Sequence, residues 1–97
     1  MKEERIEKIK EIVKEYYKHN AKDEFEAILV LKKLSKYVDE FFIYGKDIFM
    51  KINNIYLIAY EYADEHEINC DVNKIDEDTY LKYFQLYKKY YDLDEEY

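Results

Sequence analysis

The sequence predicts an all-α protein, an antiparallel four-helix bundle, in which residues 1–97 form a single domain. The chain contains no proline and one glycine, whereas strand-rich domains use these residues at most of their reversals. Hydrophobic residues make up 48% of the chain and charged residues 40%, which is the balance of a folded protein with a separate core and surface. We therefore expect helices at residues 2–19, 21–44, 47–66 and 76–92.

The first helix, residues 2–19, is predicted by apolar side chains that recur at helical spacing. These residues are Ile6, Ile9, Ile12, Val13, Tyr16 and Tyr17. The opposite face carries glutamate and lysine, whose opposite-sign pairs stabilise a helix by about 0.3 kcal/mol each. This charged face is predicted to be ordinary solvent-exposed surface.

The second helix, residues 21–44, follows a tight reversal in which Asn20 is the predicted N-cap and Asp23 lies in the first turn. Its apolar positions are Phe25, Ile28, Leu29, Leu31, Leu34, Val38, Phe41 and Phe42. Gly45 is the only glycine. It is predicted to end this helix in the left-handed conformation.

The third helix, residues 47–66, is predicted to be the most buried. Its polar residues fall on one narrow stripe, interrupted by Ile58, and the rest of the circumference is apolar. The stripe consists of Asp47, Lys51, Asn54, Glu61 and Glu65. A helix that is apolar around most of its surface must be surrounded by neighbours, so this segment is expected to be the axis of the bundle.

An alternative reading of the same region gives an α+β fold, with residues 39–62 as a three-stranded antiparallel meander packed against helices. Gly45-Lys46 and Asn53-Asn54 would then be the turns, because glycine and asparagine tolerate the positive φ of hairpin turns. The β-branched and aromatic residues of the region favour strands. The polar stripe, the absence of proline and the single glycine of the chain favour the helix.

The last part of the chain is predicted to be a connection, residues 68–75, followed by a helix at residues 76–92. Asp76, Glu77 and Asp78 would lie in the first helical turn, where negative charge is favourable. An aromatic face follows at helical spacing, formed by Tyr80, Tyr83, Phe84, Tyr87, Tyr90 and Tyr91.

The net charge of −7 is concentrated in the second half of the chain. Residues 1–49 carry eleven acidic and eleven basic side chains, whereas residues 50–97 carry twelve acidic and five basic ones. Arg5 is the only arginine, and nucleic-acid-binding proteins depend on basic surfaces rich in this residue. We therefore expect no direct nucleic-acid binding.

The sequence also predicts a cytoplasmic protein that has no membrane segment. Cys70 is the only cysteine, so no intramolecular disulfide can form. The first residues lack the apolar core of a secretory signal. The longest apolar run, residues 55–60, is far shorter than the roughly 20 residues that span a bilayer.

His66 stands in an acidic run, which we compared with the spacing of metal ligands. Helical ligands share a face at i+3 or i+4, but the residues at these distances before His66 are Ala63 and Tyr62. A calcium-binding loop starting at Asp71 would need glutamate at its twelfth position, where the chain has Lys82. We expect no metal site.

Catalysis is not predicted either. Cys70, His19 and His66 are the candidate nucleophile and bases, and no motif joins them into a catalytic arrangement. One glycine cannot build a phosphate-binding loop. We therefore expect neither an enzyme nor a cofactor.

The remaining hypothesis is a binding module that uses an acidic, tyrosine-rich face to bind a basic protein. The candidate partner-binding residues are Glu61, Asp64, Glu65, Glu67, Asp71, Asp76, Glu77, Asp78, Tyr83, Tyr87, Tyr90 and Tyr91. Carboxylates steer association with a positive surface, and buried tyrosines supply affinity. A nuclease or nucleic-acid-binding protein would be a suitable target, to be inhibited or regulated.

In gross character this is similar to small acidic immunity proteins, antitoxins and viral or phage inhibitors of host defence, although no family motif is matched. The alternative is a structural role, in which the tyrosine-rich face binds a second copy. The protein would then be a homodimer or a subunit of an assembly.

Overall fold

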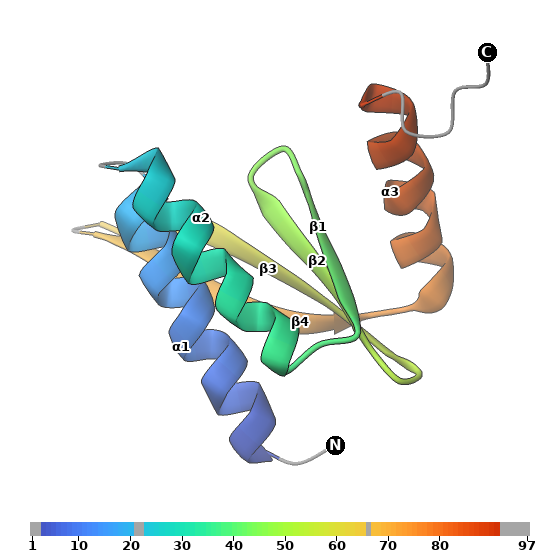
Figure 1. Ribbon diagram of the computed structural model, residues 1–97, viewed down its shortest axis with the longest axis horizontal. Coiled ribbons are helices and arrows are strands. Elements are labelled where there is room, and N and C mark those ends of the chain that lie inside the picture. Colours follow the sequence, from blue (N-terminus) through green and yellow to red (C-terminus); the bar gives the residue numbers. More distant parts are fainter. Residues whose placement is uncertain (1–2, 21–22, 66, 92–97) are drawn as a thin grey trace.

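The computed structural model of the chain describes residues 3–20, 23–65 and 67–91 and shows an α+β fold (Figure 1). Two helices and a short 3₁₀ helix precede a four-stranded antiparallel sheet, and a third helix follows it. The elements are α1 (Glu3–Asn20), α2 (Glu24–Lys32), η1 (Lys33–Lys36), β1 (Glu40–Tyr44), β2 (Asp47–Ile52), β3 (Ile55–Ala63), β4 (Ile68–Ile75) and α3 (Glu77–Tyr90). Each strand pairs with the next one in the chain, so the sheet order is β1-β2-β3-β4.

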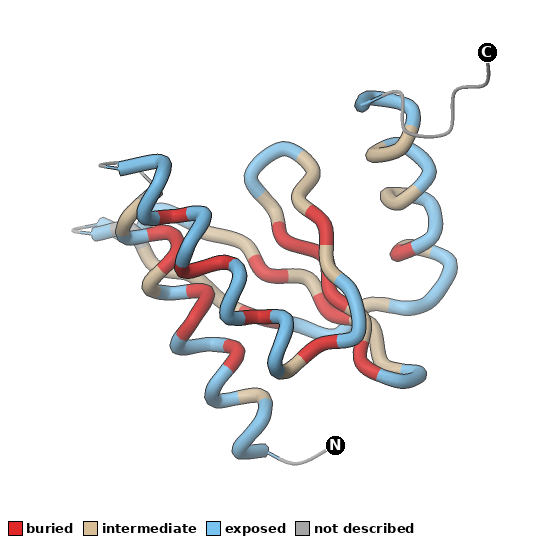
Figure 2. Tube along the Cα trace, viewed as in Figure 1, coloured by how far each residue is buried: buried red, intermediate tan, exposed pale blue. Residues whose placement is uncertain are grey.

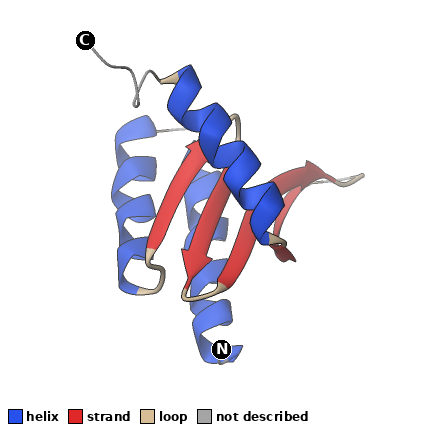
Figure 3. Ribbon diagram, turned by 90° about the vertical axis from the view of Figure 1, so that its right-hand side faces the viewer, coloured by secondary structure: helices blue, strands red, loops and turns tan. Residues whose placement is uncertain are grey.

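The elements form three layers, with α1 and α2 on one face of the sheet and α3 on the other (Figures 1 and 3). The larger core cluster lies between α1, α2 and the sheet, and includes Ile9, Val13, Leu34, Ile48 and Met50. The smaller cluster lies beneath α3 and is built around Phe42, Phe49 and Tyr80. Figure 2 shows the buried segments lining the space between the layers.

The predicted four-helix bundle is wrong. Residues 47–66 contain β2, a turn and β3 in place of a central helix, and the predicted second helix is replaced from Glu40 onward by β1. The error has a physical cause: Ile48 and Met50 face α1 and α2, while Phe49 between them faces α3. A strand covered on both faces loses its polar–apolar alternation, so periodicity cannot distinguish it from a buried helix.

The alternative meander matches the first three strands, including both turns. Residues 45–46 connect β1 to β2, and residues 53–54 connect β2 to β3. The first residue of each turn has a positive φ, 67° at Gly45 and 52° at Asn53. The connection predicted at residues 68–75 is wrong, because these residues form the fourth strand, β4. Its composition, rich in Asn, Asp and Lys, does not resemble a strand, although it pairs with β3 over eight residues.

The first and last predicted helices are present, as α1 and α3, and their ends differ from the prediction by a few residues.

Two helices begin at an aspartate cap. Asp23, and not Asn20, caps α2, because its carboxylate accepts hydrogen bonds from the backbone N–H groups of Phe25 and Glu26 at 3.1 and 3.3 Å. Asp76 caps α3 and accepts from the Thr79 N–H at 2.8 Å. Hydrogen bonding with Thr79, through its side chain and backbone, lowers the pKa of Asp76.

Gly45 should tolerate substitution poorly because of its backbone conformation. Alanine at this position would be held at a φ of +67°, which L-residues disfavour, and the free energy of unfolding should fall by about 1 kcal/mol. A Cβ atom would meet no atom within 4 Å, so a steric clash does not contribute. Urea unfolding measures the loss. Gly45→Asn, which accepts positive φ more readily, should lose less, and equal losses in both variants would contradict this explanation.

Candidate functional site

The side of the β3–β4 hairpin that faces α3 continues beyond this helix. Tyr56 and Ile58 of β3 pack in the cluster beneath α3. The next two side chains on the same face, Tyr60 and Tyr62, lie farther toward the hairpin turn, and Tyr62 is 46% exposed. Figure 3 shows the end of the hairpin extending past α3. Part of the sheet therefore presents its side chains to solvent.

Polar residues of β4 complete this surface. Asn69 pairs with Tyr62, Asp71 with Tyr60, and Asn73 with Ile58. The Asn73 side-chain amide donates a hydrogen bond to the Tyr60 hydroxyl at 2.7 Å, and the rings of Tyr60 and Tyr62 are 6.2 Å apart. We call this surface the open hairpin face and define it as Tyr60, Tyr62, Asn69, Asp71 and Asn73.

The turn next to the open hairpin face is strongly acidic. Asp64 and Glu67 are exposed and hold the turn together, because the Asp64 N–H donates to the Glu67 carbonyl at 2.8 Å. The Asp64 carboxylate also accepts from the Glu65 N–H at 2.6 Å. We call Glu61, Asp64, Glu65 and Glu67 the hairpin tip. Together with Asp71 they bring five carboxylates into residues 60–73, a segment that contains no lysine or arginine.

The opposite face of the hairpin packs toward α1. Glu61 pairs with Cys70 there, and burial raises the pKa of the nearby Tyr16, with further contributions from Glu61 and Glu24. Burial also raises the pKa of the Cys70 thiol, the largest of several influences on it. The thiolate is the reactive form of cysteine, and a raised pKa disfavours it. Cys70 is therefore suited to packing against the core and not to acting as a nucleophile.

The acidic residues predicted to form one belt are divided between two places. Glu61, Asp64, Glu65 and Glu67 lie at the hairpin tip, whereas Asp76, Glu77 and Asp78 lie at the start of α3, beyond the other end of β4. Eight residues of strand separate the groups, which corresponds to about 25 Å. Figure 1 shows this end of the hairpin on the opposite side of the molecule from α3.

The predicted tyrosines of α3 are also divided. Tyr83 stacks on Phe49 with ring centres 4.8 Å apart, and Tyr87 lies 4.9 Å from Phe42, so both contribute to the core cluster beneath α3. Tyr90 and Tyr91 remain 72% and 52% exposed. Only the last two are therefore well exposed for contact with a partner.

Sequence reasoning missed Tyr60, Tyr62, Asn69 and Asn73 as candidates. A helix assignment places Tyr60 and Tyr62 on different sides, and the assignment of residues 68–75 as a connection hid the strand that pairs with them. The available signal was short: only Tyr60, Glu61 and Tyr62 alternate in polarity with the period of a strand, because Leu57 and Ala59 are as apolar as their neighbours.

Among the described residues, no group of three or more His, Cys, Asp or Glu side chains is placed to hold a metal ion. His66 lies outside the described residues. Within the part of the chain that the structure describes, no helix has the length and apolar character needed to cross a membrane. Comparisons of the chain with protein-family models, curated proteins and solved structures found no match.

Proposed function

We propose that this protein is a non-catalytic, cytoplasmic binding module whose open hairpin face and hairpin tip dock onto a positively charged protein surface. The observation that carries the proposal is the composition of residues 60–73, which combine the exposed ring of Tyr62 and the half-buried ring of Tyr60 with five carboxylates and contain no lysine or arginine. A nuclease or nucleic-acid-binding protein presents a surface of the required charge. Occupying that surface would inhibit or regulate the partner.

The two parts of the hairpin would make different contributions to binding. Tyrosine is enriched among the residues that dominate binding energy, since its ring fills a pocket while its hydroxyl makes hydrogen bonds. Tyr60 already directs its hydroxyl toward Asn73, which orders its ring before binding. Carboxylates at the tip would accelerate association and align the partner, an effect that salt weakens.

Charge reversal at the two separated acidic sites tests this proposal. Asp64→Lys/Glu67→Lys changes the hairpin tip, and Glu77→Lys/Asp78→Lys makes the same change in charge at the start of α3. The full-length chain is used to retain partners from cells of its source at low salt, and the affinity of the purified basic partner is then measured. We expect the tip variant to bind at least tenfold more weakly and the α3 variant to bind like the wild type.

Tyr62→Ala provides a second arm of the same experiment. Loss of a central tyrosine should weaken binding by about thirtyfold or more, the usual cost at a hot spot. Retention of no basic protein would refute the proposal. Equal weakening by both charge variants would also refute it, because net charge alone, and not the hairpin, would then explain the binding.

A further inference from the structure

The helix α2 is apolar on both sides, although the molecule covers only one of them. Ala27, Val30 and Leu31 are buried against the rest of the protein. On the opposite side, Phe25 is 70% exposed, Ile28 50% and Leu29 46%. Exposed segments recur along α2 in Figure 2. Apolar residues all around a helix are typical of a helix buried on every side, and a contiguous exposed apolar surface marks an interaction site.

The exposed side of α2 has opposite charges at its two ends. Phe25, Ile28 and Leu29 continue at helical spacing into Lys32, and we call these four residues the α2 stripe. Glu24 and Glu26 flank its beginning, whereas Lys32 and, in η1, Lys36 lie at its end, and all four of these charged residues are exposed.

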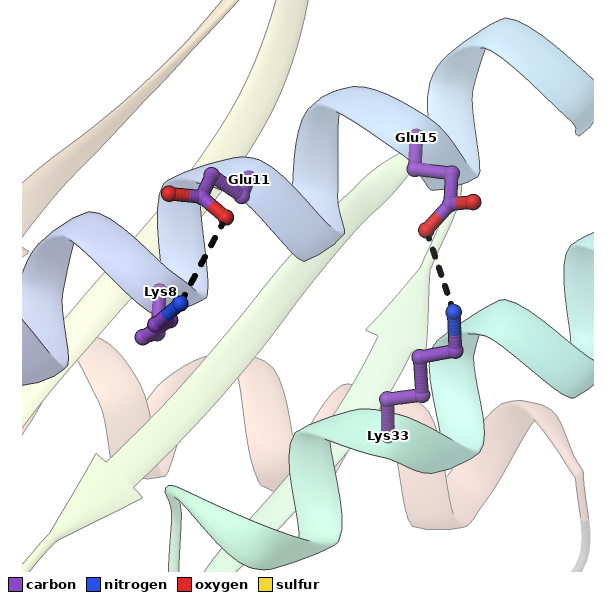
Figure 4. Close-up of polar contacts among 4 residues, drawn as sticks. All are labelled: Lys8, Glu11, Glu15 and Lys33. Atoms are coloured by element: carbon purple, nitrogen blue, oxygen red, sulfur yellow. Dashed lines mark hydrogen bonds and ion pairs between the residues drawn. The ribbon is translucent and has the colours of Figure 1, made fainter.

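Other charges near this surface have partners within the molecule. The Lys33 ammonium lies 3.3 Å from the Glu15 carboxylate of α1, and Lys8 lies 4.0 Å from Glu11 (Figure 4). Lys33 therefore links η1 to α1. Lys32 and Lys36 are the lysines that this end of α2 presents to a partner.

We propose that the α2 stripe binds the α2 stripe of a second copy of this chain, with the two helices antiparallel about a twofold axis. Such an interface must be complementary to itself. The antiparallel arrangement places the acidic beginning of each stripe against the basic end of the other, whereas a parallel arrangement would place acid against acid. The axis passes between Ile28 and Leu29, and Phe25 lies against Lys32 of the second copy, a favourable contact of a ring with a cation.

The charge pattern selects a second copy over a partner of one charge sign. A uniformly basic surface would be repelled by Lys32 and Lys36, and a uniformly acidic one by Glu24 and Glu26. The dimer also leaves the open hairpin face accessible, because α2 covers the face of the sheet opposite to it. Self-association is therefore independent of the binding proposed for the hairpin, and either can fail alone.

Sedimentation of the full chain tests the dimer. The measured mass should rise from 12.1 kDa toward twice this value between concentrations of about 5 and 500 µM, a range that suits a small interface. Phe25→Ser should weaken the dimer at least tenfold. Tyr90→Ser is the matched control, because Tyr90 is a similarly exposed aromatic residue, 72% against 70%, and it should leave the dimer unchanged. Circular dichroism and thermal melting verify that both variants fold.

Charge exchange tests the antiparallel arrangement. Lys32→Glu/Lys36→Glu and Glu24→Lys/Glu26→Lys should each be monomeric alone, since each brings like charges together. An equimolar mixture should regain dimers, because every end then meets the opposite charge. A wild-type chain that stays monomeric at all concentrations overturns the proposal, as does a dimer that Tyr90→Ser weakens and Phe25→Ser does not. Failure of the mixture to restore dimers overturns the antiparallel arrangement.

Discussion

Replacing Tyr80 by alanine should lower the free energy of unfolding by about 3–5 kcal/mol, the usual cost of deleting a large aromatic side chain from a core. Tyr80 is 1% exposed and is the buried anchor of α3. Its ring centre lies 5.4 Å from that of Phe42 and 4.8 Å from that of Tyr56. Its hydroxyl donates a hydrogen bond to Glu40 at 2.7 Å, linking α3 to β1. Urea unfolding measures the loss.

Tyr80→Phe separates packing from hydrogen bonding. This variant keeps the ring and loses only the bond to Glu40, so it should cost about 1 kcal/mol. Because Tyr80 holds α3 on the sheet, the alanine variant should also speed hydrogen exchange in α3 more than in α1. Equal losses of stability for alanine and phenylalanine, or unchanged exchange in α3, would contradict the role of the ring as an anchor.

Alkaline pH should destabilise the fold through Tyr17 and Tyr80. The Tyr17 hydroxyl donates to the backbone carbonyls of Lys46 at 2.6 Å and Ala59 at 3.1 Å, which connects α1 to the sheet. Burial, followed by the charge of Asp47, raises the pKa of Tyr17 well above 10. Burial and the bond to Glu40 raise the pKa of Tyr80 in the same direction. The folded protein therefore keeps both protons where the unfolded chain releases them.

The stabilisation from these protons is fully present below about pH 10 and declines as the pH rises above it, toward the pKa values of the folded state. The free energy of unfolding should fall by at most about 1.4 kcal/mol per pH unit for each tyrosine. Urea unfolding between about pH 8 and 11 measures the slope. Tyr17→Phe/Tyr80→Phe should be less stable at neutral pH and should show a shallower decline.

Tyr90→Phe is the control for the alkaline experiment, since Tyr90 is mostly exposed. This variant should keep the wild-type slope. Some decline should persist in the double variant, because burial also raises the pKa of Tyr16. If the double variant lost stability as steeply as the wild type, the two buried hydroxyls would not be the source of the effect.

The candidate site could be predicted from the sequence only in part. The acidic character of residues 61–67 is visible in the amino-acid order, and it coincides with the hairpin tip. The sequence did not show that Tyr83 and Tyr87 pack in the cluster beneath α3, whereas Tyr60 and Tyr62 lie outside this cluster and Tyr62 is exposed. Which tyrosines are accessible depends on where α3 crosses the sheet, and no local pattern records this.

The exposed side of α2 is a second case in which the sequence did not show which side chains are accessible. The sequence predicts that Phe25, Ile28 and Leu29 lie on the apolar face of a long helix, because apolar residues at helical spacing normally face the interior. In the structure α2 ends at Lys32, and only Ala27, Val30 and Leu31 reach the core. An apolar pattern indicates which side chains favour burial. The tertiary structure decides whether other parts of the same molecule bury them.

The sequence by itself determined the elements that have one covered face, because an amphipathic period records a single interface with the core. These elements are α1 and α3. The turns at Gly45 and Asn53 match the alternative meander only, because local φ preferences permit a turn at these residues without requiring one. Only the tertiary structure decided that β2 and β3 are strands. Their side chains pack against helices on both sides of the sheet, so burial removed the alternation by which a strand is recognised.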